Sequence, residues 1–410
     1  ILLSYINLVE EKELISSQNI SQIGMNKAKE KKARKSIQKR IQQYISNLKK
    51  DKRKKLFSFY VDSISGAFDP HTAYLPPEEK EDFDISMTGK LEGIGAVLRE
   101  DDGYIKIVRI IPGGAAYNHK EIEPEDIILK VTQENNTSVD LVGVAVRKAV
   151  KYIRGKKGSI VTLTIKKPSG QISTIAIKRQ LIIIEESYAK ALTIHHKKKN
   201  YGFIYLPSFY RDFNNANSRN ASLDIKKILT QFSQKDISGL ILDLRQNGGG
   251  SLKDAVEVTG HFLKIGPVVQ VKNKFKDASV LYDFDPTISY HGPIVVLIDK
   301  LSASASEILA AALQDYGRAI IIGSESSFGK GSVQTFINLD QQLSERFTQL
   351  KPLGALKLTI QNFYRINGES TQFKGVIPDI IIPSSYDHLS IGEKELPYAI
   401  KNSIIEIAPH

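Results

Sequence analysis

The stretch GPIVVLIDKLSASASEILAAALQDYGRAIIIG, from Gly292 to Gly323, predicts a strand, a helix and a second strand in succession. Its first part, "GPIVVLID", is a short continuous apolar run, which is typical of a strand buried on both faces. "SEILAAALQDYG" has a helical pattern, and Gly317 is a natural C-terminal cap for that helix. With the earlier strand "ISGLILDLR" and the amphipathic "SLKDAVEVTGHFLK", this alternation predicts helices packed on a largely parallel sheet over residues 200 to 385.

The rest of the chain is predicted to have other kinds of structure. From about residue 88 to 185, short strands such as "YIKIVRIIP" and "SIVTLTIKK" are separated by turn signals and interrupted by one helical piece, "GVAVRKAVKYI". Residues 1 to about 85 have a mostly helical pattern, and the prolines of "DPHTAYLPPEE" end any helix there. From Tyr386 onward the pattern is that of a further helical piece that is cut short.

The composition excludes several kinds of chemistry. The 410 residues contain no cysteine, which removes thiol catalysis, disulfides and zinc–thiolate sites. None of the eight histidines has the spacing of a metal-binding pair, so we expect neither a metal site nor a cofactor. No run of about 18 apolar residues occurs, as a membrane-spanning helix would need, and no signal peptide is recognisable.

Much of the net charge of +12 lies in one segment, Lys27 to Phe57. Such a segment can bind nucleic acid or an anionic membrane surface, or it can be a solvated helix. Ile37, Ile41, Ile45 and Leu48 recur at helical spacing and give the segment an apolar stripe to bury. Because no base-reading motif accompanies the charge, we favour a solvated helix and expect no nucleic-acid partner.

Three serines, Ser302, Ser304 and Ser306, alternate with alanine where the predicted strand passes into the helix. A serine at this place is a common helix N-cap. A serine on a strand-to-helix turn can instead be a nucleophile, because its hydroxyl is raised out of the sheet beside backbone N–H groups that face an acyl oxygen. One cap needs only one serine, and the alanines permit a close approach to the backbone, so both interpretations stay open.

A nucleophilic serine needs a base, and "SSFGKGSVQ" contains a candidate, Lys330 between two glycines. The pKa of lysine is ordinarily about 10.4, so the side chain must lose solvent to act as a base near neutrality. The flanking glycines allow close packing, and Gln334 could orient the amine by a hydrogen bond. The stretch also resembles a phosphate-binding P-loop, but five residues separate Gly323 from Gly329 and Gly331 stands where Ser or Thr is required, which argues against nucleotide binding.

Two glycine-containing loops complete the candidate sites. "LDLRQNGGGSL", Leu242 to Leu252, could hold an anion or the oxyanion of a tetrahedral intermediate on backbone N–H groups, although a tight turn is the simpler explanation. "KLEGIGAVL", Lys90 to Leu98, is a Gly-x-Gly loop that enters a strand. Such a loop can bind the terminal carboxylate of a peptide that adds a strand to the sheet edge, but a single Gly-x-Gly is weakly specific.

Six ordered motifs, "LEGIGAVL", "PGGAA", "LDLRQNGGGSL", "SASASEILAAALQDYGRA", "FGKGSVQ" and "YRINGESTQFKGVIPDI", together resemble the carboxy-terminal processing peptidases, in particular their tail-specific branch. The likeness runs from about Asp69 to Asp379. It implies a crotonase-like or ClpP-like α/β protease core with an inserted PDZ domain and an N-terminal helical domain. The expected boundaries are 1–85 for the helical domain, 86–187 for the PDZ domain, 188–385 for the core, and 386–410 for the start of a truncated C-terminal helical region.

The resemblance also implies a serine endopeptidase with a serine–lysine dyad. On this basis Ser304 is the nucleophile, Lys330 is the general base and Gln334 orients it, while the N–H groups of Gly250 and Ala305 form the oxyanion hole. Ser302 and Ser306 are then expected to be dispensable, each contributing at most about 1 kcal/mol of stability if one of them is the helix cap.

Asp315 matches an aspartate assigned to the charge relay of the family. It lies eleven residues after Ser304, which on a continuous helix is about 16 Å of rise. That distance is too long for a direct relay, so we expect Asp315 to have a structural role.

Gly93, Ile94 and Gly95 resemble the carboxylate loop of PDZ domains, which implies protein or peptide substrates with free apolar C-termini. The family further implies a periplasmic location, an adaptor lipoprotein as a partner and peripheral association with the inner membrane. Both ends of the chain look truncated, and we interpret it as a fragment. The alternative function is a non-catalytic PDZ-type adaptor on a decayed protease core, against which the intact Ser304 and Lys330 argue.

Overall fold

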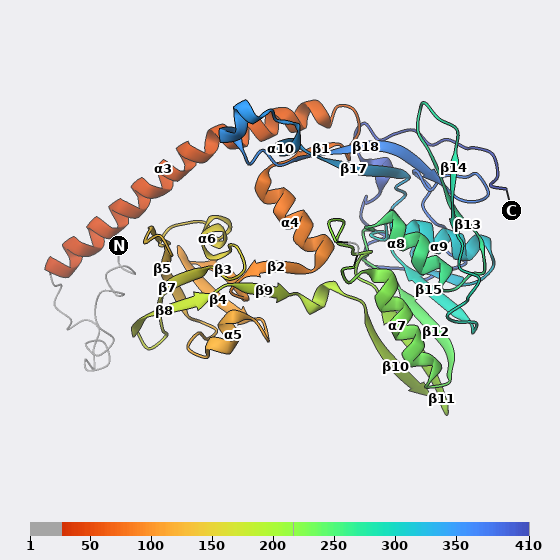
Figure 1. Cartoon of the computed structure of the whole chain (residues 1–410), viewed down its shortest axis with the longest axis horizontal. Coiled ribbons are helices and arrows are strands. Elements are labelled where there is room, and N and C mark those ends of the chain that lie inside the picture. Colours follow the sequence, from red (N-terminus) through yellow and green to blue (C-terminus); the bar gives the residue numbers. More distant parts are fainter. Residues whose placement is uncertain (1–26, 216, 410) are drawn as a thin grey trace. The chain divides into compact units, whose positions relative to one another are not determined.

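The computed structural model describes residues 27–215 and 217–409 of the chain, which folds into two compact units (Figure 1). The first unit comprises Leu91–Ile183 together with the residues up to Phe57. The second joins Ser58–Lys90 to Ile184–His410, so it is discontinuous in sequence. This division differs from the predicted helical domain of residues 1–85, because the part after Phe57 packs with residues that follow much later in the chain.

Helix α3 (Lys27–Ser65) is a single element of 39 residues, which agrees with the helical prediction for this part. Ile41 and Ile45 are 54% and 46% exposed, so the expected burial of an apolar stripe is wrong at these positions. Lysine and arginine recur through this segment and keep it hydrated. The side chain of Leu48 and the predicted helix over residues 1–26 lie outside the described residues. Across the described ranges, no helix is long and apolar enough to cross a membrane.

The proline-rich segment after α3 begins new structure as well as ending a helix. Helix α3 stops at Ser65, before Pro70. Strand β1 (Ala73–Leu75) follows, and Pro77 is then the first residue of α4 (Pro77–Thr88). The helical pattern therefore ends at this segment as predicted, and the start of a new helix at Pro77 is an addition, since a proline is tolerated where the first N–H of a helix has no intrahelical partner.

Apart from helix α3, the first unit is a small β-rich domain, as predicted. Its elements are β2 (Lys90–Gly93), β3 (Ala96–Asp101), β4 (Tyr104–Ile110), α5 (Ala115–His119), β5 (Ile127–Gln133), β6 (Ser138–Asp140), α6 (Val146–Ile153), β7 (Ile160–Lys166), β8 (Ile172–Lys178) and β9 (Gln180–Ile183). An antiparallel sheet has the order β3-β4-β5-β7-β8, with β6 paired to β5, while β2 pairs with β9. Alternate residues of the strands, such as Ile105, Ile107, Val161 and Leu163, form its buried core.

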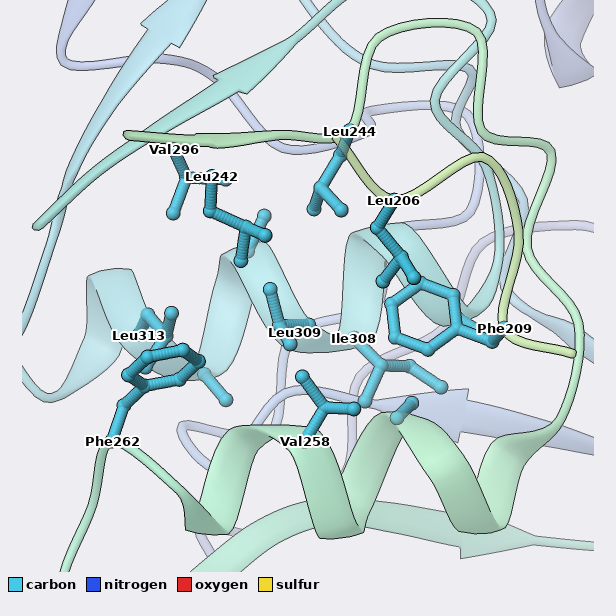
Figure 2. Close-up of a cluster of buried hydrophobic side chains, with 14 of the residues drawn as sticks. Leu206, Phe209, Leu242, Leu244, Val258, Phe262, Val296, Ile308, Leu309 and Leu313 are labelled. Atoms are coloured by element: carbon cyan, nitrogen blue, oxygen red, sulfur yellow. The ribbon is translucent and has the colours of Figure 1, made fainter. Parts of the chain in front are cut away.

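The second unit contains the predicted parallel sheet. Its strands lie in the order β10 (Lys190–His196), β11 (Lys199–Tyr205), β12 (Ile237–Asp243), β15 (Ile294–Ile298), β16 (Ile320–Gly323) and β19 (Ile380–Ile381). All neighbours from β11 to β19 are parallel, and only β10 runs antiparallel to β11. Helices α7 (Ala221–Ser233), α8 (Leu252–Gly260) and α9 (Ala305–Asp315) alternate with these strands along the chain, and Figure 2 shows side chains of α8, α9, β12 and β15 pointing toward one another.

The core of this unit places the strand ends and helix starts that form the candidate site. Leu242 and Val296 from the strands, and Val258 and Leu309 from the helices, are completely buried in it. Helix α9 ends in a Schellman motif, in which Gly317 has a φ of 59° and donates to Gln314 O while Arg318 N donates to Leu313 O. The predicted glycine cap is therefore confirmed.

A second sheet of the same unit was not predicted. It is formed by β1 together with β13 (Gly266–Lys272), β14 (Ser279–Asp283), β17 (Ser332–Asn338) and β18 (Ala355–Tyr364). The strands lie in the order β1-β18-β13-β14, and β17 also pairs with β18. Its pairings are antiparallel. The short elements that remain are α10 (Leu339–Gln342), η2 (Glu185–Ser187), η3 (Glu345–Leu350) and η4 (Glu393–Glu395).

The C-terminal residues also differ from the prediction. Instead of a helical region, residues 386–409 form an irregular segment with one short 3-10 helix, η4. The segment is held by hydrogen bonds to the second unit, in which Ile405 N donates to Gly368 O and Glu393 N donates to Phe328 O. The buried Glu393 carboxylate also contacts His71 Nε2 at 2.7 Å and accepts from Gln372 Nε2. These tertiary contacts override the weak helical pattern.

Candidate active site

Ser304 occupies the turn between strand β15 and helix α9, at the N-cap position of the helix. Its backbone has φ 56° and ψ −112°, a conformation that glycine usually adopts and that costs a residue with a Cβ about 1–3 kcal/mol. The turn therefore stores strain on the serine itself, as nucleophile turns do. Ser304 therefore stands at the cap position and also on the kind of strained turn on which nucleophilic serines occur, so both interpretations of the sequence stay open.

The other two serines are structural. Ser302 and Ser306 are both 0% exposed, whereas Ser304 is partly exposed. Ser302 Oγ donates to Leu244 O, and Ser306 Oγ donates to Asn247 O. The alternation of the serines thus places two hydroxyls into the loop that follows β12 and leaves the third accessible.

The glycine loop after β12 lies directly against the Ser304 turn. Gly249 has a φ of 105°, and a Cβ added there would lie 2.8 Å from Ser304 Cβ and 3.1 Å from Ala305 N. Gly250 has a φ of 142° and packs against the backbone of Phe209, with which it forms a bridge. The structure therefore brings the predicted loop beside Ser304 and Ala305, and only glycine permits the approach.

Asn247 joins this loop to the serine turn, and sequence analysis did not single it out. Its side chain is completely buried, with Oδ1 accepting from Gly249 N and Nδ2 donating to Leu206 O. Its backbone carbonyl accepts from Ala303 N and from the Ser306 hydroxyl. The sequence feature that could have identified Asn247 is its position directly before three glycines, where a flexible loop needs a side chain to fix it.

Lys330 lies in the loop that leads into strand β17, two residues before the strand begins. Its Nζ donates to Gln334 Oε1 at 2.6 Å and to Ser332 O at 2.9 Å, so the predicted contact between Lys330 and Gln334 is present. Burial lowers the pKa of Lys330 to about 8, although the nearby carboxylates of Glu393 and Glu307 oppose the shift. A substantial fraction of the side chain is then a neutral amine at mildly alkaline pH.

Glu307 connects the serine turn with the lysine loop, and it too was missed. Its buried carboxylate accepts from Ser304 N at 2.7 Å and Lys330 N at 3.1 Å, and also from Gly329 N and Ser327 Oγ. Burial raises the pKa of Glu307 to about 7, against the effect of these hydrogen bonds. The position three residues after the N-cap serine is that of a capping-box glutamate, which was the available signal.

The structure thus brings the backbone N–H groups of Ser304 and Lys330 to the same oxygen, Oε2, of the Glu307 carboxylate. Among the hydrogen bonds of the described residues, none joins Ser304 Oγ to Lys330 Nζ. Their backbones are nevertheless fixed to the same side chain. Such a link holds the relative position of two loops that belong to different sheets.

Asp315 does not take part in this arrangement. It is the last residue of α9, and both of its carboxylate oxygens accept from Arg365, at 2.5 Å and 3.1 Å. The bidentate pair ties the end of the helix to the residue that follows β18. This geometry agrees with the structural role that we expect for Asp315.

The predicted carboxylate loop lies in the first unit, between β2 and β3. Ile94 is buried, and its carbonyl accepts from Ala116 N, while Gly95 O accepts from Ile111 N. Because a trans peptide directs the next N–H opposite to the carbonyl, the N–H of Gly95 points away from Ala116. Gly95 has a φ of 79°, and a Cβ there would lie 3.1 Å from Ile182, so a larger residue would be crowded.

No cluster of histidine and carboxylate side chains suited to a metal ion occurs within residues 27–215 and 217–409. The candidate chemistry lies in the serine turn, the lysine loop and the glycine loop.

A serine on a strained strand-to-helix turn, near a loop that holds a lysine of lowered pKa, is typical of serine hydrolases, and the same chain has a separate β-rich domain. Residues 200–382 match peptidase family S41, residues 83–166 match the PDZ domain, and residues 7–78 match the tail-specific protease N-terminal domain. The chain belongs to the carboxy-terminal processing proteases of peptidase family S41. The family inferred from the six motifs is therefore confirmed, as is its architecture of N-terminal, PDZ and protease domains.

Individual relatives are similar over most of the chain. The tail-specific protease of Haemophilus influenzae is 40% identical over 364 residues, which cover 87% of this chain and 50% of that protein. The carboxy-terminal-processing protease of Bartonella bacilliformis is 32% identical over 355 residues, 85% of this chain and 75% of that protein. A crystal structure of the PDZ domain of a Vibrio cholerae carboxy-terminal protease in complex with a peptide is 37% identical, covering 23% of this chain and 97% of that one with a TM-score of 0.22. The chain spans half the length of the Haemophilus relative.

Proposed function

We propose that this protein is a serine endopeptidase that uses Ser304 and Lys330 and selects protein substrates by their apolar C-terminal tails. The observation that carries the catalytic part is the lysine of lowered pKa, held by Gln334 and Ser332 on a loop that shares the Glu307 carboxylate with the Ser304 backbone. Membership of a protease family supports the same reaction.

In the proposed reaction, the neutral amine of Lys330 accepts the proton of Ser304 Oγ as that oxygen attacks the scissile carbonyl. Two of the directions around Nζ are occupied by contacts to Gln334 Oε1 and Ser332 O, and the remaining one serves the proton transfer. The oxyanion is stabilised by the N–H groups of Gly250 and Ala305. The ammonium then protonates the leaving amine, and water hydrolyses the acyl-enzyme with Lys330 again as the base.

The catalytic part is tested with a serine-reactive covalent probe and a peptide cleavage assay. The full chain should be labelled at Ser304, and Ser304→Ala should abolish both labelling and cleavage while keeping the thermal unfolding transition. A folded Ser304→Ala protein with full activity would sink the assignment. A chain that binds peptides with a free C-terminus but is neither labelled nor active would instead be the PDZ-type adaptor.

Tail recognition is proposed for the loop of Gly93, Ile94 and Gly95, whose N–H groups would bind the terminal carboxylate without a charged side chain. Amidation of the substrate C-terminus should weaken cleavage, and so should terminal aspartates, which would enter an apolar pocket without a partner. Gly95→Val should have the same effect. Gly103→Val is the matched control, because Gly103 has a similar φ of 74° but open space around it.

Equal cleavage of free-acid and amidated substrates over a range of concentrations would show that the tail is not recognised. The periplasmic location, the adaptor lipoprotein and the membrane association stay predictions that follow from the resemblance. Fractionation of cells that make the full-length protein would test the location.

A further inference from the structure

A chain of hydrogen bonds continues from the candidate base beyond Gln334. Gln334 Oε1 accepts from Lys330 Nζ at 2.6 Å, and Gln334 Nε2 donates to Thr359 Oγ1 at 3.1 Å. Thr359 Oγ1 in turn donates to Asp69 Oδ1 at 2.8 Å. The chain therefore links the lysine to a carboxylate that lies 290 positions from Thr359 in the sequence.

The direction of each hydrogen bond in this chain is determined by Asp69. Burial alone would raise the pKa of Asp69, but hydrogen bonds from Thr72, Thr359 and the N–H of His71 outweigh it and hold the pKa below its usual value. The ionised carboxylate can only accept, so the single hydroxyl proton of Thr359 is directed to Asp69. Thr359 Oγ1 is then left as an acceptor, and the group that it faces on Gln334 must be the donor Nε2.

This constraint fixes the orientation of the Gln334 amide. The reversed amide would place Oε1 against a hydroxyl oxygen whose proton is already used, and Nε2 against the ammonium of Lys330, which would be a contact between two donors. Only the observed orientation presents an acceptor to Lys330. Ser332 Oγ, which accepts from Gln334 Nε2 at 3.0 Å, supports the same orientation but can donate as well as accept.

The fold explains why these groups meet. Gln334 on β17 is directly opposite Thr359 on β18, next to a register shift between Val333 and Gln334. Asp69 precedes β1, which pairs with the preceding part of β18. Thr72 Oγ1 donates to Asp69 Oδ2 at 2.5 Å and accepts from Thr359 N at 3.1 Å, so the Asp69 turn is bound to the strand at two points.

We propose that Asp69 and Thr359 are positioning residues for the candidate base, because they oblige Gln334 to present its carbonyl oxygen to Lys330. This inference rests on the proposed serine–lysine mechanism. It assigns a chemical role to the Asp69 turn, which sequence analysis treated only as the end of a helical domain.

Thr359→Val in the full chain is the decisive variant, because valine keeps the shape of threonine and lacks the hydroxyl. We expect the plateau of kcat/KM to fall roughly tenfold, the usual effect of one hydrogen bond to a charged group. We also expect the acidic limb of the kcat/KM profile to move to lower pH, because the ammonium of Lys330 loses its acceptor. The charged groups around Lys330, namely Glu393, Lys357, Glu307 and Asp69, are unchanged in this variant.

Two further variants separate positioning from stability. Thr359→Ser restores the hydroxyl and should recover both the plateau and the position of the limb. Thr259→Val removes a buried threonine hydroxyl that donates to Ala255 O on α8, away from the site, so it should lower the unfolding temperature and leave the limb in place.

In a double-mutant cycle, Asp69→Ala should move the limb less in the Thr359→Val background than in the wild-type one, because only the direct effect of the Asp69 charge on Lys330 is left to lose there. A Thr359→Val protein with an unmoved limb would overturn the proposal, whether its plateau is normal or reduced, provided that Ser304→Ala is inactive. Activity that persists in Ser304→Ala would instead remove the mechanism on which the inference rests.

Discussion

The serine turn and the lysine loop solve the same backbone problem in opposite ways. Each needs a left-handed conformation close to a reactive side chain. In the serine turn the reactive residue itself adopts it, with a φ of 56° at Ser304. In the lysine loop the neighbour adopts it, with a φ of 91° at Gly329, and Lys330 has an ordinary backbone. Ser304, the proposed nucleophile, therefore carries backbone strain that Lys330, the proposed base, avoids, because only Ser304 lies on a sharp strand-to-helix turn.

The largest expected effect is a loss of activity that should be equally severe for a substitution in the serine turn and for one in the lysine loop. Ser304→Ala and Lys330→Ala should each lower kcat by about 10³-fold or more, because nucleophile and base act as a unit. The double variant should be little worse than either single one. Steady-state cleavage of one peptide by all three variants checks this, and additive losses would show that the two residues do not work together.

Gly249→Ala should be the most damaging change that leaves both reactive side chains in place. The added Cβ would lie 2.8 Å from Ser304 Cβ at a φ of 105°, so the serine turn must move. We expect a loss of about 2–4 kcal/mol in the free energy of unfolding and nearly complete loss of cleavage.

Gly329→Ala is the matched change in the lysine loop, where the contact with Phe373 is looser at 3.1 Å. It should be less harmful in both denaturant unfolding and cleavage. The reverse order would mean that the lysine loop is the more constrained of the two.

The pH profile reports on the lysine loop. Lys330 must lose its proton to act, and burial lowers its pKa to about 8, so the acidic limb of kcat/KM should lie near pH 8. Glu307, with a pKa raised to about 7, becomes ionised over a neighbouring range and strengthens its bonds to both loops as the pH rises. Activity should therefore increase between pH 6 and 9. A limb below pH 5 would point to a carboxylate as the base.

The pKa of Glu307 also has a consequence for stability. Because the folded pKa is raised above the unfolded value, the folded state binds the extra proton between about pH 4.5 and 7. The contribution of this group is fully present below the unfolded pKa and is lost as the pH rises through 7. Glu307→Gln should flatten this part of the curve of unfolding free energy against pH.

Ser302→Ala and Ser306→Ala should have moderate effects on stability and small effects on cleavage. Each hydroxyl is completely buried and donates to a carbonyl that would be left without that partner, so the loss should be about 1–3 kcal/mol. This is more than the limit of about 1 kcal/mol that follows from capping alone. Thermal unfolding of the two variants distinguishes the values.

The smallest effect concerns the strain itself. Ser304→Gly and Ser304→Ala both remove the hydroxyl, but only glycine adopts a φ of 56° without strain. We expect Ser304→Gly to be more stable than Ser304→Ala by about 1 kcal/mol. Equal unfolding midpoints would mean that the turn relaxes when the hydroxyl is removed.

The two sheets of the second unit differ in how well their sequences predicted them. The parallel sheet was predicted because its strands, such as β12 and β15, are continuous apolar runs that alternate with amphipathic helices. The antiparallel sheet was missed because β1 and β18 pair across a separation that local patterns do not reveal. The irregular structure of residues 386–409 was missed for the same reason, because their hydrogen-bond partners, such as Gly368 and Phe328, lie far from them in the sequence.

The candidate site shows the same limit. Ser304, Lys330 and Gln334 could be named because they occur in recognisable motifs, and the contact between Lys330 and Gln334 spans only four positions. Asn247 and Glu307 act through buried hydrogen bonds whose partners are loops elsewhere in the chain. Their roles depend on which loops the fold brings together, and a local sequence pattern does not show which loops will be neighbours.

The pairing of β1 with β18 also sets the order in which the site can be assembled during synthesis. The ribosome makes Asp69 and its turn long before Thr359, the hydrogen-bond partner that follows 290 positions later. Likewise, His71 is made long before its partner Glu393, which follows 322 positions later. A nascent chain that has just passed Ser304 has its serine but lacks the lysine and the strand that orients it. The candidate site is therefore complete only when residues near the end of this stretch of chain have been made, so shorter translation products would contain Ser304 without a positioned Lys330.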